Sequence, residues 1–402
     1  SFPTRRSSDL GDPFATEAAA MAERGLRVLG FAAAQVDDID ETSNPSGLQF
    51  LGFIGMIDPL RPGAKEAVAE CQRAGITVSM ITGDHPVTAL AIARELGFAD
   101  HPSQVVTGAD LVGKTEAELA ELVKHARVFA RTTPRDKLNL VGAARASGHF
   151  VAVTGDGVND APALRAANIG VAMGKSGTDV AREASELVIA DDQFSTIIKG
   201  VEEGRVAYDN VRKVIYLAAS TGAAEVLILA LAMFSGWPNN AAGLVLPLIP
   251  VQLLWLNLVT NGIQDVALAF EPQEGDVLAR PPRRADEPIF DRLMIERIIL
   301  AAGVMTVVAY GVFGYLIEVA RWEDAQARNV VLLLMVLFQN VHIGNCRSET
   351  ISGFRLSPFR SPILLGGVLL ACGTHLAAMH IPLTQRLLKI EPVDFRTFAT
   401  MF

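Results

Sequence analysis

The chain has 402 residues and a net charge of -9, with 50% hydrophobic and 20% charged residues. This length exceeds what one hydrophobic core usually serves, so we expect more than one domain. The acidic balance leaves no broad basic surface, which argues against a nucleic-acid partner. A mean hydropathy of +0.31 indicates a lipid-embedded part joined to a water-soluble part. The three cysteines are far apart and predict neither a disulfide framework nor a thiolate metal site.

The first ten residues, SFPTRRSSDL, fit no helix or strand pattern. They resemble a read-through translation of a common sequencing adapter. We therefore interpret residues 1–10 as an assembly artefact and exclude them from reasoning about the fold.

From residue 48 to residue 210 the sequence alternates short apolar runs with helical patterns, which is typical of an α/β domain. Helices are predicted from Pro62 to Ala74, after Thr115 with its capping box, and after Thr133, where Pro134 occupies the first helical position. The apolar runs predict buried parallel strands, because each is nearly continuous and four to six residues long. These strands are expected at 76–81, 127–130, 150–154, 169–172 and 187–190.

After residue 210 the chain becomes strongly apolar, and we assign residues 211–402 to a transmembrane domain. A helix needs about 20 residues to cross a bilayer, and five stretches are close to that length. Arginines gather in the loops after the second and fourth stretches, and the positive-inside tendency then places the α/β domain in the cytoplasm. The predicted spans are 214–234, 244–270, 296–320, 329–345 and 362–380.

The motif Thr154-Gly155-Asp156-Gly157-Val158-Asn159-Asp160 directly follows the predicted strand 150–154. An open α/β sheet places its ligand crevice at such a strand end. Magnesium binds oxygen ligands and is usually held by one or two carboxylates together with phosphate oxygens. The two carboxylates and the amide of this motif therefore predict a magnesium site.

Two other motifs supply groups for a phosphoryl substrate. Thr82-Gly83-Asp84 ends another predicted strand, and Lys137 opens the helix that follows Thr133. A hydroxyl, an ammonium and carboxylates converging on one phosphoryl group are what phosphoryl transfer requires.

The run from 154 to 174, TGDGVNDAPALRAANIGVAMG, resembles the hinge motif of P-type ATPases, which are members of the haloacid dehalogenase superfamily. MIDPLR (56–61), MITGD (80–84), FARTTPRDKL (129–138) and the stretch 183–204 resemble other motifs of that family in order and spacing. The resemblance covers the chain from Gly11 to its end. It implies a Rossmannoid, haloacid dehalogenase-like α/β parallel-sheet domain in the cytoplasm and an α-helical transmembrane bundle.

The resemblance also implies roles for single residues. Asp156 and Asp160 would hold Mg²⁺ with the support of Asn159, while Thr82 and Lys137 would bind phosphoryl oxygens of the substrate ATP. GLRVLGFAA (25–33) resembles the last part of the nucleotide-binding domain, so residues 11–47 are assigned to a remnant of that domain. The resemblance implies contacts to the nucleotide, or coupling to it, by Arg27, Asp84 and Arg131.

The family's phosphorylated aspartate, in the motif Asp-Lys-Thr-Gly, does not occur in these 402 residues. We therefore interpret the chain as a C-terminal fragment whose missing N-terminal part belongs to the same polypeptide, and we expect it to be inactive alone. The phosphorylation domain, 48–210, would then lack its nucleophile.

Two alternatives remain open. Asp38-Ile39-Asp40-Glu41-Thr42 matches the Asp-x-Asp-x-Thr nucleophile motif of soluble haloacid dehalogenase phosphatases, so a membrane-anchored phosphatase using Asp38 is possible. The run of acidic and loop-forming residues around it favours a linker instead. The second alternative, a non-catalytic membrane regulator, is supported only by the missing nucleophile.

Polar residues in the first two predicted spans predict a cation site. An ionisable group at mid-membrane costs roughly 2.5 to 3.5 kcal/mol, so Glu225 in the first span is a functional candidate. The second span carries further polar residues at spacings of three and four, which places them on one helix face, and its prolines and Gly262 permit local unwinding. The candidate ligands are Glu225, Asn257, Thr260, Asn261 and Asp265.

The run 250–272 resembles the sixth membrane helix of calcium, sodium/potassium and proton/potassium pumps. Asn257 and Thr260 match calcium-pump ligands, Asn261 stands where those pumps have aspartate, and Gln339 stands where they have glutamate. Oxygen ligands without cysteine favour a hard cation. We expect calcium, with a sodium/potassium-type pump as the alternative, in a multi-pass protein of a bacterial plasma membrane.

Overall fold

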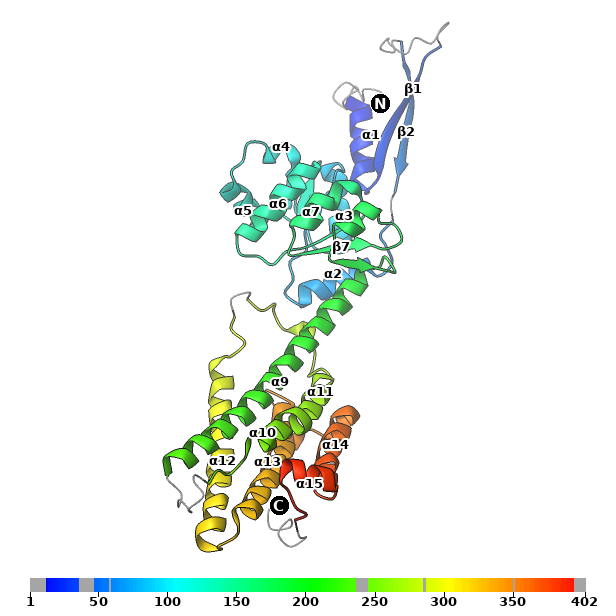
Figure 1. Cartoon of the computed structure of the whole chain (residues 1–402). Helices are drawn as coiled ribbons and strands as arrows, with labels where there is room; N and C mark the ends of the chain where they lie inside the picture. The colour runs from blue at the N-terminus through cyan, green and yellow to red at the C-terminus, as the bar shows by residue number, and fades with distance from the viewer. Residues whose placement is uncertain are drawn as a thin grey trace. The chain divides into compact units, whose positions relative to one another are not determined.

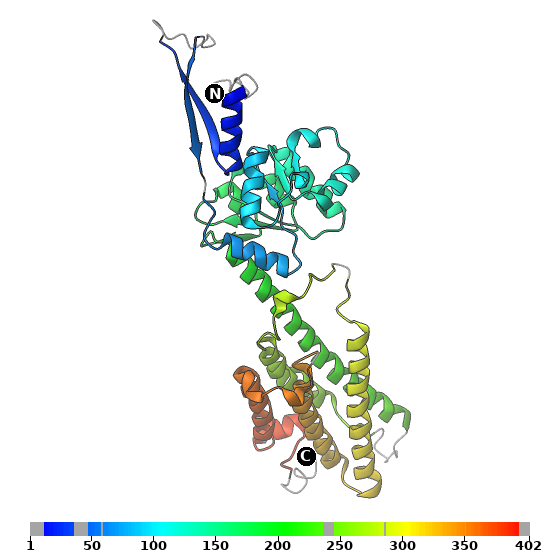
Figure 2. The same ribbon diagram turned by 180° about the vertical axis from the view of Figure 1, so that it is seen from behind.

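The computed structural model of this protein describes residues 12–35, 47–57, 59–235, 245–284, 287–349 and 351–393. The chain divides into two compact units, of which the first comprises Ser1–Glu202 with Leu278–Ala285 and the second Glu203–Val277 with Asp286–Phe402. Helix α9 (Phe194–Ser235) has residues in both units (Figures 1 and 2). The predicted artefact 1–10 and the alternative nucleophile Asp38 lie outside the described residues.

The first unit begins with helix α1 (Asp12–Glu23), which packs beside an antiparallel pair of strands, β1 (Arg27–Ala33) and β2 (Gln49–Met56). Arg27 pairs with Met56, and the register shifts between Phe31 and Ala32. Neither strand was among those predicted from the sequence. In β2 the glycines Gly52 and Gly55 interrupt the apolar residues, which obscures the strand pattern.

Two parallel sheets follow and confirm the predicted α/β class. In one sheet the order is β3-β5-β4, and in the other it is β6-β7-β8. The predicted strand 76–81 pairs only at its last two residues. β4 was not predicted, because Val105 and Val106 are too short an apolar run to indicate a buried strand. The strands are β3 (Met80–Ile81), β4 (Val105–Thr107), β5 (Val128–Ala130), β6 (Ala152–Gly155), β7 (Ile169–Met173) and β8 (Leu187–Ile189).

Helices surround these strands, and their starts follow the capping signals in the sequence. Thr115 caps α5 and its backbone N–H donates to Glu118 Oε2 at 2.8 Å, as the capping box predicts. Thr133 caps α6 with Asp136 in the same arrangement. The helices of the first unit are α2 (Ala64–Arg73), α3 (Pro86–Leu96), α4 (Gly108–Leu111), α5 (Glu116–His125), α6 (Pro134–Ala146), α7 (Ala161–Ala166) and α8 (Asp179–Glu183), with 3₁₀ turns η2 (Pro102–Gln104) and η3 (Val158–Asp160).

The second unit is helical. Besides α9 it contains α10 (Pro250–Trp255), the π-helical η4 (Leu256–Asn261), α11 (Gly262–Ala269), α12 (Arg292–Gly314), the π-helical η6 (Tyr315–Val319), α13 (Asp324–Cys346), α14 (Pro362–Ala378) and α15 (Pro382–Leu388). Short 3₁₀ turns occur at η7 (Gly353–Arg355) and η8 (Pro358–Arg360), while η5 (Val277–Ala279) has residues in both units.

Within the described residues, three helices are long and apolar enough to cross a membrane: Phe194–Ser235, Arg292–Val319 and Asp324–Cys346. A fourth candidate is the pair α14 and α15, which is bent by 91°. The predicted span 244–270 is helical from Pro250 to Ala269. It is not one of these candidate spans, because its polar residues lower its mean hydropathy. The five-span arrangement therefore stays a prediction.

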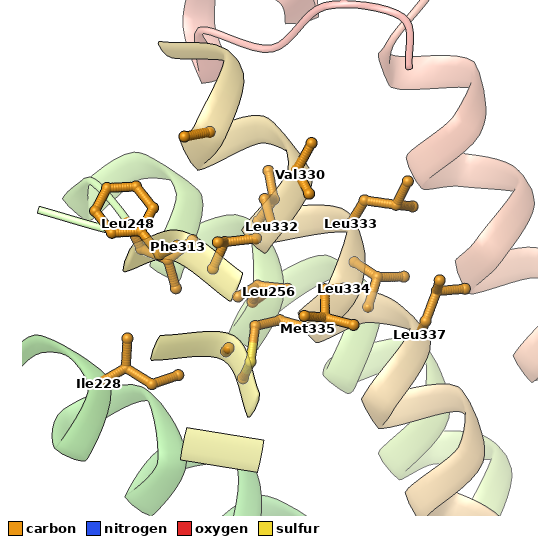
Figure 3. Packing of buried hydrophobic residues seen from close by; sticks show 14 of the residues in the cluster. Ile228, Leu248, Leu256, Phe313, Val330, Leu332, Leu333, Leu334, Met335 and Leu337 are labelled. Atoms are coloured by element: carbon orange, nitrogen blue, oxygen red, sulfur yellow. The ribbon is translucent and has the colours of Figure 1, made fainter. Parts of the chain in front are cut away.

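The core of the second unit is centred on α13. Its consecutive residues from Val330 to Leu337 are all apolar and buried, so this stretch of the helix is surrounded by protein on every side. Figure 3 labels Val330, Leu332, Leu333, Leu334, Met335 and Leu337 of this helix, together with Ile228 of α9, Leu256 of η4 and Phe313 of α12 from the same core cluster. The central position of α13 fixes the helices that carry the polar residues described below.

Buried ion pairs join the loops of the second unit. Arg347 Nε donates to Glu271 Oε1 at 2.9 Å, and the two side chains are 6% and 1% exposed. Lys213 Nζ lies 2.8 Å from Glu274 Oε1, with the lysine side chain 3% exposed. Removing one partner of such a pair leaves an uncompensated buried charge.

We expect Arg347→Ala to lower the free energy of unfolding by about 3–5 kcal/mol, because Glu271 loses its partner. Arg292→Ala is the matched control, since Arg292 is 92% exposed and pairs with Glu296 on the surface. That change should cost at most about 1 kcal/mol. Denaturation of the purified chain in detergent measures both values, and equal effects of the two substitutions would contradict this view of the pair.

Candidate functional site

The first part of the candidate site lies at the carboxyl ends of strands β3 and β5. Thr82 directly follows β3, and its hydroxyl donates to Asp84 Oδ2 at 2.9 Å. Thr132, in the loop after β5, donates two hydrogen bonds to the carbonyl of Thr82. Its backbone N–H donates at 3.1 Å and its hydroxyl at 3.0 Å. The predicted residues Thr82 and Asp84 are thus held as one hydrogen-bonded turn.

The nucleotide-coupling candidate Arg131 lies beside this turn. Its backbone N–H donates to the carbonyl of Asp84 at 3.0 Å, and its φ of 51° is in the left-handed region. A non-glycine residue in this region is uncommon and is frequent at functional sites. Partial burial and the neighbouring Arg131 lower the pKa of His85. The remaining candidate for nucleotide contact, Arg27, is the first residue of β1 and is exposed.

The second part of the candidate site follows β6, where the motif turns through η3. Lys137 of α6 donates to Asp160 Oδ1 at 2.6 Å, and the backbone N–H of Gly157 donates to Asp160 Oδ2 at 3.2 Å. A Cβ at Gly155 would lie 2.6 Å from Asp160 Cβ, so only glycine permits this close approach. Asn159 lies exposed between these residues.

These contacts differ between the two carboxylates that were predicted from the sequence as magnesium ligands. Both oxygens of Asp160 accept hydrogen bonds from the protein, whereas the Asp156 carboxylate is 55% exposed and, among the described residues, contacts only Arg61, in an ion pair at 3.9 Å. Magnesium is usually bound by one or two carboxylates plus phosphate oxygens, so Asp156 fits as the direct ligand. Asp160 instead fits a role in holding Lys137.

A second candidate site lies inside the helical unit, on the helix that runs from α10 through η4 to α11. Asn257 Nδ2 donates to Glu225 Oε2 at 2.6 Å, and Asn261 Nδ2 donates to Thr221 Oγ1 at 3.0 Å. Both partners belong to α9, where residues four apart share a face. Four of the five predicted ion ligands, Glu225, Asn257, Thr260 and Asn261, therefore lie along the contact of this helix with α9 and α13.

The contact with α13 is equally polar. Thr260 Oγ1 donates to Gln339 Oε1 at 2.7 Å, and one turn later Gln264 Nε2 donates to Asn340 Oδ1 at 2.5 Å. Thr260 and Asn261 belong to the π-helical segment η4. Such segments occur frequently at functional sites, because the wider turn shifts side chains and alters the backbone hydrogen bonds.

Several buried oxygens in this row accept no hydrogen bond from any described residue. Glu225 Oε1 and Asn261 Oδ1 are examples, on side chains that are 5% and 2% exposed. An unpartnered buried acceptor costs about 1–3 kcal/mol, and a cation is the partner that satisfies several acceptors together. The oxygens of this kind are Glu225 Oε1, Asn261 Oδ1, Gln264 Oε1 and Asp265 Oδ1.

The fifth predicted ligand, Asp265, lies at the other end of the row. It follows Asn257, the partner of Glu225, by eight residues, which would span about 12 Å along an α-helix axis and somewhat less here, because Leu256–Asn261 is π-helical. Within the described residues no three His, Cys, Asp or Glu side chains form a metal cluster. The expectation that Glu225 and Asp265 bind one ion together therefore has no support in this geometry.

Four residues of these sites were not predicted from the sequence: Thr221, Gln264, Asn340 and Arg61. Thr221 could have been found, since it precedes Glu225 by four residues and so shares its face. Arg61 lies far from Asp156 in the sequence, and nothing in its local pattern indicates their contact.

Comparisons with known proteins match both parts of the chain to protein families. Residues 14–168 match the haloacid dehalogenase-like hydrolase family, and residues 245–402 match the family described as cation transporting ATPase, C-terminus. The two matches fall on the unit with the phosphoryl-type motifs and on the unit with the polar row. The chain belongs to the P-type cation-transporting ATPases.

Curated relatives of this P-type ATPase chain extend the match over nearly all of its length. It is 40% identical to the "Probable cation-transporting ATPase F" of Mycobacterium bovis over 95% of the chain, and 39% identical to the "Calcium-transporting ATPase" of Bacillus subtilis over 93%. It is 34% identical to the "Calcium-transporting ATPase type 2C member 2" of Rattus norvegicus over 92%. The chain spans 42% of the length of the two bacterial relatives and 38% of the rat protein.

Proposed function

We propose that this chain is part of an ATP-driven pump that moves calcium across a membrane through an aspartyl-phosphate intermediate. The observation that supports this proposal most strongly is the row of buried, unpartnered oxygens in the helical unit, combined with a haloacid dehalogenase-like unit in the same chain. In the proposed reaction an aspartate carboxylate attacks the γ-phosphorus of ATP, ADP leaves, and water later hydrolyses the acyl-phosphate.

In this proposal the first unit positions the phosphoryl group. The Thr82 hydroxyl and the Lys137 ammonium bind phosphoryl oxygens, and Asp160 keeps the ammonium in place through its 2.6 Å contact. Asp156, supported by Asn159, holds Mg²⁺, which when bound neutralises charge on the transferring group. Arg27, Asp84 and Arg131 contact the nucleotide or couple its movement to this unit. The motif Asp-Lys-Thr-Gly does not occur in these 402 residues, so in this proposal the nucleophilic aspartate comes from another part of the pump.

The helical unit supplies the ion path. We propose that the cation binds between α9 and η4, with Glu225 as its anionic ligand and Asn257, Thr260 and Asn261 as neutral oxygen ligands. Asp265 would act at the other end of the row, as a second cation position. Calcium accepts flexible shells of six to eight oxygens, and two of the relatives described above carry calcium in their names.

A second candidate ion has one specific observation in its favour. The two carboxylates lie at opposite ends of the row, so each position offers one negative charge, which suits sodium or potassium as well as calcium. Activation of the pump by calcium but not by sodium would decide against the monovalent ion.

The cellular location of the protein is part of the same proposal. We propose that the apolar helices cross a bacterial plasma membrane several times and that the first unit lies in the cytoplasm, where ATP is available. ATP, the cation and membrane lipid are then the partners of this chain.

The proposal predicts that the purified 402-residue chain forms no phosphoenzyme from radiolabelled ATP, because it has no acceptor aspartate. A chimera in which the chain replaces the aligned part of the Bacillus subtilis calcium-transporting ATPase should form one. Hydroxylamine should remove that label, as it does from acyl-phosphates. Labelling of the chain alone would contradict the proposal, and loss of that labelling in Asp38→Ala would instead support the phosphatase.

A further inference from the structure

Arg61 lies beside the proposed magnesium ligand. It belongs to the segment between β2 and α2, and its guanidinium Nη2 lies 3.9 Å from Asp156 Oδ2. The same guanidinium donates from Nη1 to the carbonyl of Asp192 at 3.0 Å and from Nη2 to Ser176 Oγ at 3.4 Å. All four residues belong to the first unit. A fixed positive charge therefore faces the carboxylate that has no other described partner.

The surrounding backbone holds Arg61 in this position. Pro62 follows it directly and disfavours a helical conformation at Arg61. Asp192, which accepts the guanidinium bond, has a φ of 59°, and this uncommon conformation turns its carbonyl toward Arg61. The anchor for the guanidinium is thus built into the backbone and does not depend on Asp156.

Asp192 also connects the segment that holds Arg61 to the motif 154–160. Its carboxylate accepts the backbone N–H groups of Lys175 at 2.9 Å and Ser176 at 2.7 Å, and these bonds lower the pKa of Asp192 to about 2. In the same loop, the backbone N–H of Thr178 donates to the carbonyl of Asp156 at 2.8 Å. The segment 175–178 therefore contacts both the guanidinium of Arg61, through Ser176, and the backbone of Asp156, through Thr178.

We propose that Arg61 is a tethered counter-ion of Asp156 that competes with magnesium for this carboxylate. The inference rests on the proposed function, because it takes Asp156 as the magnesium ligand. At 3.9 Å, with side chains that are 46% and 55% exposed, the ion pair is weak enough for a divalent cation to displace. Arg61 then keeps the affinity for free magnesium low, so that the metal enters mainly together with the phosphate oxygens that complete its shell.

The sign of the effect distinguishes this role from a structural one. A residue that merely supported the site would weaken metal binding when removed, whereas a competing charge strengthens it. We expect Arg61→Ala to tighten the binding of Mn²⁺, which shares the octahedral oxygen preference of Mg²⁺, by about two- to five-fold. The difference should shrink in concentrated salt, because exposed charges are screened.

The experiment is a Mn²⁺ titration of the full chain in detergent, with free Mn²⁺ followed by electron paramagnetic resonance. Asp156→Asn identifies the site by removing it. Arg94→Ala is the control for net charge, since Arg94 is exposed and its Nε donates to the carbonyl of Asp100, at 2.8 Å, in a different part of the unit. Arg94→Ala should leave the dissociation constant unchanged.

Arg61→Gln separates charge from structure, because glutamine can still donate hydrogen bonds to Asp192 or Ser176 but carries no charge. It should tighten Mn²⁺ binding as Arg61→Ala does, while Arg61→Lys should stay near the wild type. Unchanged or weaker binding in the folded Arg61→Gln variant overturns the inference and leaves the proposed function intact. If the wild type shows no Asp156-dependent Mn²⁺ site, the magnesium assignment and the inference both fail.

Discussion

Asp156→Asn in the chimera is expected to reduce the rate of phosphoenzyme formation from ATP by at least about 100-fold, the scale seen when one preorganised electrostatic contact to a transition state is lost. Of the two motif carboxylates, only Asp156 keeps oxygens that no described protein hydrogen bond occupies, so no neighbour can replace it. Rapid-quench measurement of the labelled phosphoenzyme at limiting magnesium gives the rate.

Nucleotide binding provides the internal control for this substitution. The nucleotide contact proposed for Arg27 belongs to the β1–β2 region, so the affinity for ATP should stay within a few-fold of the wild type. Asp179→Asn is the matched control, because this side chain is 87% exposed and pairs with Arg182. A near-normal rate in Asp156→Asn, or an equal loss in Asp179→Asn, would show that Asp156 does not hold the metal.

Glu225→Gln in the chimera should raise the calcium concentration needed for half-maximal phosphorylation by about 10-fold or more, since the change removes the only described carboxylate at its end of the polar row. One lost charge-assisted contact of about 1.5–3 kcal/mol corresponds to roughly 10- to 150-fold. Glutamine keeps the size of the side chain and can still accept the hydrogen bond from Asn257. Phosphorylation by inorganic phosphate should persist, because that reverse step needs no cytoplasmic ion.

Asp265→Asn tests whether the row has one cation position or two. If Asp265 serves a second position, the substitution should also weaken calcium activation, and it should change the steepness of the calcium dependence rather than only shift it. An unchanged calcium dependence in Asp265→Asn would remove Asp265 from the ligands. Unchanged activation in Glu225→Gln would contradict the ion site as a whole.

The sequence predicted the parts of the fold that carry strong local signals. The parallel strands, the caps at Thr115 and Thr133 and the phosphoryl-type motif at 154–160 all depend on residues that are neighbours in the chain. The structure confirms these strands and caps, although the strand at 76–81 pairs only at Met80 and Ile81. Pairing partners depend on residues far apart in the sequence, and β4 was not recognised because its apolar run consists of only Val105 and Val106.

For the two candidate sites, too, the sequence indicated local spacing but not the contacts between distant residues. Spacing placed Asn257, Thr260, Asn261 and Asp265 on one face of a helix, but it could not show how far along the axis each partner lies. Because Glu225 contacts Asn257, Asp265 is left near the other end of the row. Likewise, the motif predicted both Asp156 and Asp160 as metal ligands, but it could not show that Lys137 donates a hydrogen bond to Asp160 at 2.6 Å.

The most direct test of the central claim is uptake of radioactive calcium by sealed, inside-out membrane vesicles that contain the chimera of this chain with the Bacillus subtilis relative. We expect uptake that requires ATP and magnesium, is released by a calcium ionophore, and is lost in both Asp156→Asn and Glu225→Gln. A chimera that is correctly inserted and forms the acyl-phosphate, yet accumulates no calcium, would contradict the assignment of this chain to a calcium pump.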